Sequence, residues 1–475
     1  MRKVLQIAMS VCVLMATLVV AAIPFHIGAM ASHGQVTDHL SANAPGLWGT
    51  YLQSPGRDGF NASETAINAT SAAHLKLHWT FQAGAMISVQ PVEANGLTFW
   101  GSWDGIEHAI DSSGKQVWAT GLGTAPPLNC IKYTTGTTST ATVSTQVIAG
   151  GPRKTVYVGG GLSMFYALDA ATGTVLWHTR LSANSSAFIW SSPVVYGTTV
   201  YATTASLGDC PLIPGKVFAL DARTGTVLHT FTLVPKGCTG AGVWGSPTLD
   251  SATGTLYVAT GNASQCTSAT PLAEAVVELR ASDLSLVGSW QAPPSNVPDS
   301  DFGSTPTLFQ ATIGGVRTPL LGVANKNGTY YVFKRDALAR GPVWSVQVAV
   351  GGKCPECGDG SISPSAFDGT NLYVAAGTTT VAGQSCTSSV RAVNPASGHF
   401  RWEHCFKDGV LLGAVSAVRG VVFAGEGAHE VALDANTGST LFHFVSSAPI
   451  YSPASIANGV VYFGNNNGTL YALGL

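Results

Sequence analysis

A short segment with the pattern of strand, turn and strand recurs along this chain, and the recurrence is the strongest constraint on its fold. In the clearest copy, residues 166–177, Asp169 and Gly173 occupy the turn and Trp177 follows it. The Asp side chain can accept backbone N–H groups two residues on, and the Gly supplies the positive φ of a bulged hairpin. Because a unit this short cannot bury its apolar faces alone, the copies must stack on one another. Further copies begin at Phe218 and Val431, and weaker ones at His108 and Arg391.

The repeat divides the chain into seven full modules and a short remainder, and most modules open with a Pro-containing strand. The remainder, 451–475, holds only two or three strands, and the alternating segment 75–81 can supply its missing outer strand. Pairing the chain ends in this way leaves no frayed blade. The full modules span about 88–120, 142–181, 190–233, 244–291, 303–348, 361–406 and 413–445.

This organisation predicts an all-β fold over residues 47–475, an eight-bladed β-propeller of four-stranded antiparallel blades. The chain ends are expected to close one blade together. Seven blades remain an alternative if one weak module is an insertion. A parallel β-solenoid is the other interpretation of the repeat, but the module length favours antiparallel hairpins.

Composition agrees with many short strands and argues against one class of partner. Charged residues make up only 10% of the chain, whereas about 25% is typical of globular proteins. Gly is abundant, with 55 residues, as tight turns require. The net charge is -2 and no basic run is present, so nucleic acid is not expected as a partner.

The N-terminus has the pattern of an export signal. Arg2 and Lys3 precede a mostly apolar run, and the small-residue site Ala29-Met-Ala31 follows it. These features predict a secretory signal over 1–31 and a flexible leader over 32–46, and hence a periplasmic, extracellular or cell-surface protein. The apolar run is near spanning length, so an uncleaved segment that associates with a membrane is the alternative.

Cysteine usage points to disulfides. One cysteine lies in the predicted signal and leaves eight others, an even count that suggests disulfides in an exported chain, with 105 connectivities open. Cys386 and Cys405 fall in one module and form a plausible pair. Cys354 and Cys357 suggest a small disulfide loop, and the following Gly358 excludes a c-type haem attachment motif, which requires His there.

The repeated pattern Ala-x-Asp-Ala-x-Thr-Gly-x-x-x-Trp, together with the module length, resembles the pyrroloquinoline quinone (PQQ) repeat. The likeness covers residues 47–475. That repeat builds the eight-bladed quinoprotein alcohol dehydrogenases, whose Trp residues dock neighbouring blades. The opening segment from Ser63 to Trp79 is most similar to the polyvinyl-alcohol-dehydrogenase branch. The repeat is specific for the fold and much less so for catalysis, since outer-membrane assembly lipoproteins carry it too.

Four positions resemble the quinone site of that family. Trp244 matches the residue whose indole forms the floor under PQQ, and an indole offers a large flat π-surface. Asn262 matches a ligand of Ca²⁺, for which an amide oxygen is suitable. Asp301 matches the residue that shares the metal and acts as general base, taking the alcohol proton as hydride leaves the carbinol carbon for the quinone. Lys326 matches the cation that polarises a quinone carbonyl.

Each of these four residues also has a purely structural interpretation. Trp244 could dock blades, Asn262 could end a strand, Asp301 could belong to a solvated acidic loop, and Lys326 could occupy a hairpin turn, because Asn327-Gly328 is itself a strong turn signal.

The sequence also departs from the family pattern. The vicinal cysteine pair over the cofactor is absent, as is the calcium-binding Glu, although Asp209 lies near its expected place. Ser88 stands where an early-blade Glu contacts the quinone, and Ser361 or a neighbour where a later Asn does. Gly303 replaces the extra carboxylate of lanthanide-dependent relatives.

Two functions from different classes therefore follow. The resemblance implies an exported oxidoreductase that uses PQQ and Ca²⁺ to oxidise small or polymeric alcohols, including secondary ones. Its electrons would leave to a separate acceptor, because no haem motif is fused to the chain. The alternative is a non-catalytic propeller that acts as a scaffold or binding platform at the cell envelope. The four matched residues favour the first function, and the departures favour the second.

Overall fold

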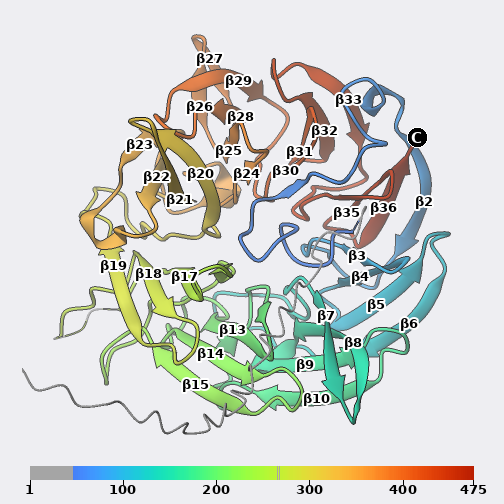
Figure 1. Ribbon diagram of the computed structural model, residues 1–475, viewed down its shortest axis with the longest axis vertical. Coiled ribbons are helices and arrows are strands. Elements are labelled where there is room, and N and C mark those ends of the chain that lie inside the picture. Colours follow the sequence, from blue (N-terminus) through green and yellow to red (C-terminus); the bar gives the residue numbers. More distant parts are fainter. Residues whose placement is uncertain (1–46, 265, 267) are drawn as a thin grey trace, which may run out of the picture. The chain divides into compact units, whose positions relative to one another are not determined.

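The computed structural model describes residues 47–264, 266 and 268–475. The predicted signal and leader, 1–46, lie outside the described residues. Within residues 47–475, eight main sheets follow one another in chain order around a ring, and each sheet is one blade (Figure 1). This arrangement confirms the predicted eight-bladed, all-β propeller.

Each of the first four blades contains four main strands. Blade 1 contains β3 (Val92–Ala94), β4 (Leu97–Gly101), β5 (Ile106–Asp111) and β6 (Gln116–Gly121). Blade 2 contains β7 (Thr142–Ile148), β8 (Gly151–Gly159), β9 (Met164–Asp169) and β10 (Val175–Arg180). Blade 3 contains β12 (Val194–Tyr196), β13 (Thr199–Ser206), β14 (Lys216–Asp221) and β15 (Val227–Thr232), with β11 (Ala187–Phe188) beside β13. Blade 4 contains β16 (Thr248–Asp250), β17 (Thr255–Ala259), β18 (Ala275–Arg280) and β19 (Leu286–Gln291).

The last four blades repeat this order. Blade 5 contains β20 (Thr307–Ile313), β21 (Val316–Ala324), β22 (Thr329–Lys334) and β23 (Trp344–Gln347). Blade 6 contains β24 (Ala366–Phe367), β25 (Leu372–Ala376), β28 (Ser388–Val393) and β29 (Phe400–Phe406), and carries the hairpin β26 (Thr379–Val381) and β27 (Gln384–Cys386). Blade 7 contains β30 (Ser416–Val418), β31 (Val421–Glu426), β32 (His429–Asp434) and β33 (Thr440–Val445). Blade 8 contains β34 (Ser455–Ala457), β35 (Val460–Gly464), β36 (Thr469–Gly474) and β2 (Lys76–Gln82).

Two early strands fasten the ring. β2 pairs antiparallel with β36, with Lys76 opposite Gly474 and Gln82 opposite Thr469, and the two strands lie side by side in Figure 1. The predicted closure of one blade by both chain ends is therefore confirmed. β1 (Phe60–Asn61) adds in parallel to β30 in blade 7, a pairing that the repeat pattern does not predict.

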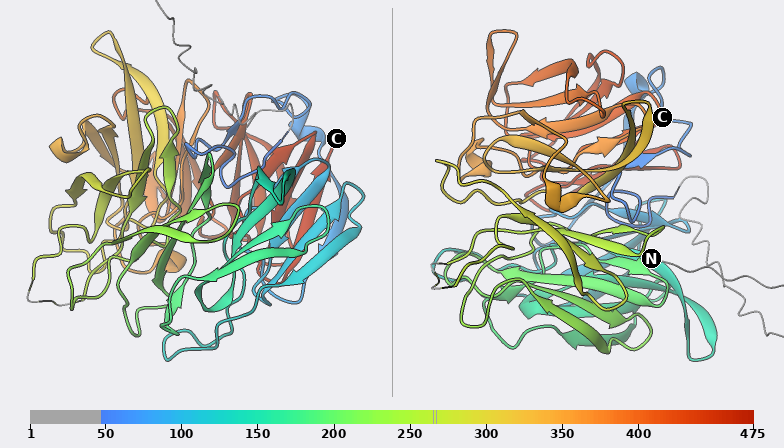
Figure 2. Two further views of the ribbon diagram at one scale, coloured as in Figure 1. Left: turned by 60° about the horizontal axis from the view of Figure 1, so that its bottom comes forward. Right: turned by 60° about the vertical axis from the view of Figure 1, so that its left-hand side comes forward.

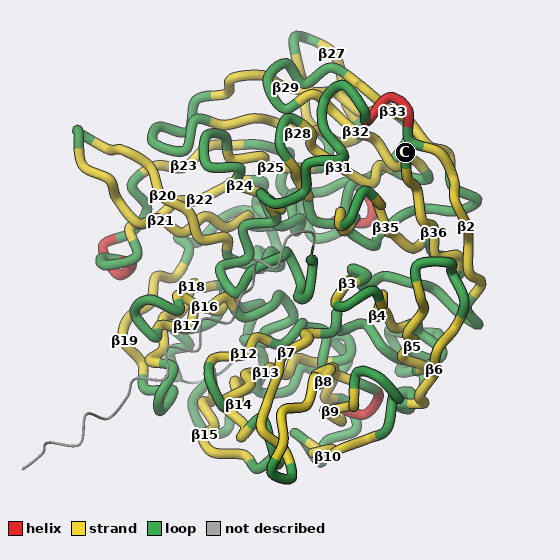
Figure 3. The backbone as a smooth tube through the Cα atoms, turned by 45° about the vertical axis from the view of Figure 1, so that its right-hand side comes forward, coloured by secondary structure: helices red, strands yellow, loops and turns green. Residues whose placement is uncertain are grey.

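Helical structure is confined to four short 3-10 turns among the described residues (Figure 3). In this part of the chain, no helix has the length and apolar character needed to cross a membrane. The 3-10 turns are η1 (Ala72–His74), η2 (Gly161–Ser163), η3 (Leu338–Arg340) and η4 (Pro355–Cys357).

Two hairpins project from the ring. Figure 2 shows the β7–β8 and β26–β27 hairpins extending past their neighbours.

The repeated turn joins each blade to its neighbour. In blade 2, Asp169 Oδ1 accepts the N–H groups of Ala171 at 3.0 Å and Thr172 at 3.1 Å. Gly173 has a φ of +70°, and a Cβ there would come within 2.6 Å of the Trp118 ring from blade 1. The Trp118 Nε1–H donates to Ala170 O at 3.0 Å, so the indole of one blade docks on the turn of the next. The same donation occurs from Trp79 to Ser112, Trp177 to Ala222, Trp344 to Pro395 and Trp402 to Ala435.

A second belt of hydrogen bonds joins the inner ends of the blades. The N–H of Thr140 donates to Ser192 Oγ at 3.0 Å, that of Ser192 to Ser246 Oγ at 2.9 Å, and that of Ser246 to Thr305 Oγ1 at 2.9 Å. A Pro follows Ser192, Ser246 and Thr305, and a Pro leaves no further N–H to satisfy there. The belt therefore explains the Ser/Thr-Pro motif and fixes the residues nearest the centre of the ring.

The structure contains four disulfides in its described residues. The predicted pair Cys386–Cys405 and the predicted loop Cys354–Cys357 are both present. The remaining bonds, Cys130–Cys210 and Cys238–Cys266, join separate connections between strands.

Candidate functional site

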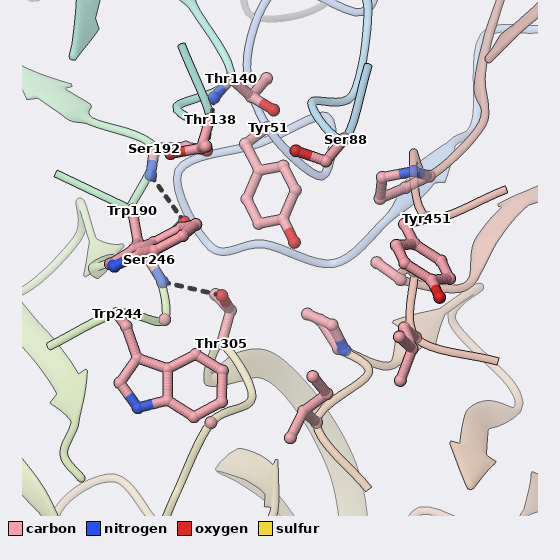
Figure 4. Close-up of a pocket in the computed structure, with 18 residues that line it drawn as sticks. Tyr51, Ser88, Thr138, Thr140, Trp190, Ser192, Trp244, Ser246, Thr305 and Tyr451 are labelled. Atoms are coloured by element: carbon pink, nitrogen blue, oxygen red, sulfur yellow. Dashed lines mark hydrogen bonds between the residues drawn. The ribbon is translucent and has the colours of Figure 1, made fainter. Parts of the chain in front are cut away.

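A cavity of about 160 Å³ lies at the centre of the ring, and segments that lead into the innermost strands of all eight blades line it. Tyr51, Trp190, Trp244 and Tyr451 supply aromatic surface, with Trp244 and Tyr451 on opposite sides in the view of Figure 4. None of the described residues that line it is charged. Hydroxyl groups come from Ser88, Thr138, Thr140, Ser192, Ser246 and Thr305.

Trp244 precedes β16 and lines this cavity instead of docking on a neighbouring turn. Its ring packs against Gly303, which also lines the cavity, and a Cβ at position 303 would collide with the indole. The absence of a side chain at Gly303 therefore allows the chain to approach the ring closely. The Lys326 ammonium lies 5.3 Å from the centre of the same ring, within cation–π range.

Asp301 lies between two neighbouring turns. Its Oδ1 accepts the backbone N–H of Asn262 at 2.6 Å, and its Oδ2 lies 2.9 Å from Lys326 Nζ. Lys326 Nζ also lies 2.8 Å from Asp299 Oδ2. The structure thus brings together all four residues singled out from the sequence, Trp244 included. Asn262 takes part through its backbone, and no hydrogen bond to its side-chain amide occurs among the described residues.

Backbone contacts hold this arrangement in place. The Lys326 N–H donates to Asp301 O at 3.0 Å, and the Phe302 N–H donates to Thr260 O at 3.1 Å. Asn325 Nδ2 donates to Ser300 O at 2.8 Å, while Asn325 Oδ1 accepts an N–H from its own turn. The β19–β20 connection is therefore bound to the β17–β18 turn of blade 4 and to the β21–β22 turn of blade 5. Lys326 does occupy a hairpin turn, but its side chain reaches across to the connection.

Burial dominates the electrostatics of this cluster. Asp301 is 5% exposed and Lys326 is 7% exposed. Burial raises the pKa of Asp301 to about 7, although the neighbouring Lys326 ammonium opposes the rise. Burial alone would lower the pKa of Lys326, but the charges of Asp301 and Asp299 outweigh it and raise that pKa. The ion pair is therefore desolvated and held on both sides of the lysine.

The charges of this cluster also shift the pKa values of two further carboxyl groups. Burial raises the pKa of Asp209, the charge of Asp299 raises it further, and Lys326 opposes both. Burial also raises the pKa of Glu274, with the charge of Asp299 again adding to the effect. Asp209 is the residue that the sequence resemblance places near the expected position of the calcium-binding Glu. Carboxylates outnumber the single ammonium here, a balance that suits a hard divalent cation with oxygen ligands.

Sequence reasoning overlooked several residues of the site. Asp299 is the second partner of Lys326, and its spacing of two from Asp301 was the only signal. Trp190 also lines the cavity, and it precedes Ser192-Pro193 just as Trp244 precedes Ser246-Pro247. A search for Trp-x-Ser-Pro would have found both indoles. Ser88 lines the cavity too, but its Oγ accepts the Trp103 Nε1–H at 2.8 Å.

Comparison with known proteins agrees with this architecture. Residues 103–283 and 387–474, more than half of the chain, match the PQQ-repeat family model described as outer membrane protein assembly factor BamB. A polyvinylalcohol dehydrogenase from Sphingopyxis sp. (strain 113P3) is 25% identical over 440 residues, covering 79% of this chain and 64% of the relative. A polyvinylalcohol dehydrogenase from Pseudomonas sp. is 24% identical over 438 residues, covering 81% and 65%. The chain thus spans somewhat less than two thirds of the length of these relatives.

Solved structures share the fold. The quinohemoprotein alcohol dehydrogenase from Comamonas testosteroni superposes with a TM-score of 0.72 at 19% identity, covering 92% of this chain and 81% of that one. BamB from Moraxella catarrhalis superposes with a TM-score of 0.57 at 14% identity, covering 84% of this chain and 100% of that one. Both an enzyme and an assembly factor are therefore similar in fold. The match to more than half of its length shows that this chain belongs to the PQQ-repeat family of eight-bladed propellers.

Proposed function

We propose that this chain is an exported oxidoreductase that oxidises alcohols, with PQQ as its cofactor and Ca²⁺ as its metal. One observation carries the proposal. Trp244, Asn262, Asp301 and Lys326 form a connected cluster, joined by contacts of 2.6 Å, 2.9 Å and 5.3 Å, and Trp244 is the member of the cluster that lines the central cavity. Two polyvinylalcohol dehydrogenases match 79% and 81% of the chain, so polymeric and secondary alcohols are the substrates we expect.

The residues around the cavity fit a planar, anionic quinone on one wall. Trp244 would lie against its rings, Lys326 would offset its negative charge, and the hydroxyl of Thr305 could hydrogen-bond to its edge. Asp301 and the Asn262 amide would supply oxygen ligands to Ca²⁺, with Asp299 close by. The cavity is smaller than the roughly 300–1,000 Å³ of most small-molecule sites. Binding therefore requires side chains at its rim to move.

The chain's own residues would perform the proton transfer and position the charges. The Asp301 carboxylate would take the hydroxyl proton of the alcohol, since a positioned carboxylate is an effective general base. The Asn262 N–H orients this carboxylate through Oδ1 and leaves Oδ2 on the side of Lys326. Lys326 would stabilise negative charge that develops beside it. The quinone, when bound, supplies the acceptor for the hydride of the carbinol carbon, and a separate carrier would take the electrons onward.

Export is part of the same proposal. Four disulfides are typical of oxidising compartments, and the predicted signal over 1–31 provides a route to one. If this segment is retained, it would associate the propeller with a membrane. Otherwise the propeller would be released at the outer side.

Reconstitution tests the proposed activity. The full chain is incubated with PQQ and Ca²⁺, and reduction of an artificial electron-accepting dye is followed with polyvinyl alcohol oligomers and with simple secondary alcohols. We expect dye reduction that requires the chain, PQQ and an alcohol together. A chelator and omission of PQQ serve as controls.

The absence of a vicinal cysteine pair and the presence of Ser88 favour one other function, a non-catalytic binding platform. No alcohol-dependent dye reduction under any of these conditions would support that platform and overturn the enzymatic proposal.

A further inference from the structure

A second cluster of ionisable side chains lies where blade 6 leads into blade 7. Asp408 belongs to the β29–β30 connection, Glu426 ends β31 and His429 begins β32. His429 Nδ1 lies 3.6 Å from Asp408 Oδ2 and 3.7 Å from Glu426 Oε2. One donor atom from each residue lies within 4.8 Å of the others. The cluster shares no residue with the Asp301 site, which belongs to blades 4 and 5.

The separations in this cluster suit a shared ion better than direct contact. The His429 Nδ1 is buried and has no hydrogen-bond partner among the described residues, and 3.6 Å is too long for such a bond. Leaving a buried polar atom unpaired costs free energy. Ligand atoms at 2.0–2.2 Å from a tetrahedral ion lie roughly 3.3–3.6 Å apart. The two separations from His429 Nδ1, 3.6 Å and 3.7 Å, are therefore close to the spacing that a small cation would impose, and the two carboxylate donors lie within 4.8 Å of each other.

Glu426 shows why this place in blade 7 differs from its counterparts. In blades 5 and 8, Asn325 and Asn465 follow the second strand, and each accepts an N–H from its own turn. Glu426 instead reaches the neighbouring connection, where its Oε1 accepts the N–H of Asp408 at 2.6 Å and of Gly409 at 3.0 Å. This leaves Oε2 on the side of His429. The side chain is only 3% exposed, and a positive partner would stabilise a carboxylate buried in this way.

We propose that Asp408, Glu426 and His429 bind a divalent transition-metal ion, and that Zn²⁺ fits the ligand set best. One imidazole nitrogen with two carboxylate oxygens suits Zn²⁺, whereas Ca²⁺ prefers oxygen ligands throughout. The Asp408 side chain is 66% exposed, so the site opens to solvent and leaves a coordination position for water or a small anion. The exposed His443 ring packs against the His429 ring, with centroids 4.5 Å apart, and steadies it.

Titration with Zn²⁺ tests this site directly. The full chain, purified without a histidine tag and stripped with chelator, is titrated with ZnCl₂ by calorimetry, and its thermal unfolding is followed in parallel. We expect one tight Zn²⁺ per chain and a Tm that rises with Zn²⁺ concentration, because an ion that binds only the folded state stabilises it by mass action. Ca²⁺ should bind at least about tenfold more weakly at this site.

Variants assign the ion to these residues. His429→Ala and Glu426→Gln should each weaken Zn²⁺ binding at least about tenfold. Asp408→Asn should do the same, and because Asp408 is exposed, this variant keeps the test valid if a buried substitution impairs folding. His178→Ala removes an exposed histidine of blade 2 and should leave binding unchanged, as should Asp301→Asn. Co²⁺ provides a second readout, since its visible absorption should appear in the wild type and be lost in His429→Ala.

Three results would each overturn the proposal. The wild type could fail to bind Zn²⁺, the Asp408→Asn and His429→Ala variants could bind it as tightly as the wild type, or Ca²⁺ could bind equally well in a manner that depends on His429.

Discussion

The tryptophans that dock the blades of this propeller and the tryptophan Trp244 occupy different places and have different neighbours. Five of them dock blades from outer strands, and each Nε1–H donates to a carbonyl of the next blade's turn at 3.0–3.1 Å. Trp244 precedes an innermost strand, lines the central cavity and lies beneath the Lys326 ammonium. The docking group comprises Trp79, Trp118, Trp177, Trp344 and Trp402.

The difference between these groups follows from the repeat. A Trp at the repeat position packs its ring against a Gly of the adjacent blade and donates its N–H to a backbone carbonyl there. The fold itself therefore accounts for both contacts. Trp244 lies outside that register and has Gly303 and a charged side chain as neighbours instead. Residues that obey the repeat therefore hold the blades together, and those that depart from it are the candidates for function.

The largest effect is expected for Asp301→Asn. The substitution removes the proposed base, so the reconstituted alcohol oxidation should fall by roughly 10²–10⁴ in kcat/KM. The fold should persist, because Asp299 still pairs with Lys326 and the Asn oxygen can still accept the Asn262 N–H. Dye-linked kinetics and a denaturant unfolding curve measure the two quantities. Wild-type activity in this variant would remove Asp301 from the mechanism.

Removal of a docking indole should have the opposite effect, a large loss of stability with little change in cofactor binding. Trp177→Ala should lower the free energy of unfolding by about 3–5 kcal/mol, because a large buried ring and its hydrogen bond are lost. The affinity for PQQ should change little where the variant is folded. His229→Ala is the matched control, since His229 occupies the same position of the repeat in blade 3 but is exposed. Equal losses of stability in both variants would contradict the docking role.

Gly303→Ala tests the close approach between residue 303 and the Trp244 ring. The added Cβ would collide with the Trp244 ring, and such overpacking typically costs about 1–3 kcal/mol of stability. It should also displace the ring and weaken PQQ binding. Gly121→Ala is the control, because nothing lies within 4 Å of a Cβ built there. If Gly303→Ala and Gly121→Ala behave alike in unfolding and in PQQ binding, Trp244 and Gly303 are not in the contact described.

A buried acid outside the site, Glu107, is expected to make the stability of the fold depend on pH. Glu107 is fully buried, neither of its carboxylate oxygens has a hydrogen-bond partner among the described residues, and burial raises its pKa well above the usual range. The folded state thus holds a proton that the unfolded chain releases near pH 4.5, so stability should fall as pH rises above that value. The slope approaches about 1.4 kcal/mol per pH unit until the folded-state pKa is reached. In Glu107→Gln, denaturant curves from pH 5 upward should lack this contribution, and an unchanged slope would exclude Glu107 as its source.

The sequence allowed the fold to be predicted nearly in full because the repeat encodes local turns and their spacing. The positions of Asp169 and Gly173 are enough to predict a turn. The last module is too short to form a blade alone, so it requires a further strand, which the structure supplies as β2. The parallel pairing of β1 with β30 was missed, because it joins segments more than 350 residues apart through backbone atoms alone.

The site was predictable only as a set of positions. Family motifs singled out Asp301 and Lys326, but not the second ion pair with Asp299, whose backbone has a φ of +60°. Asn262 was expected to act through its side chain, and the structure shows its N–H bound to Asp301. Such details depend on how two blades meet, and no periodic pattern records that. The cluster of Asp408, Glu426 and His429 was overlooked for the same reason, since its three residues come from separate elements.

Equilibrium binding of PQQ tests the central claim most directly. PQQ is titrated, with Ca²⁺ present, into the wild type, Trp244→Ala and Trp177→Ala, and binding is followed by quenching of tryptophan fluorescence and by dialysis. We predict one PQQ per wild-type chain, retained affinity in Trp177→Ala and a loss of about tenfold in Trp244→Ala, as expected when about 1.4 kcal/mol of stacking is removed. No binding by the wild type, or equal affinity in all three proteins, would contradict the account.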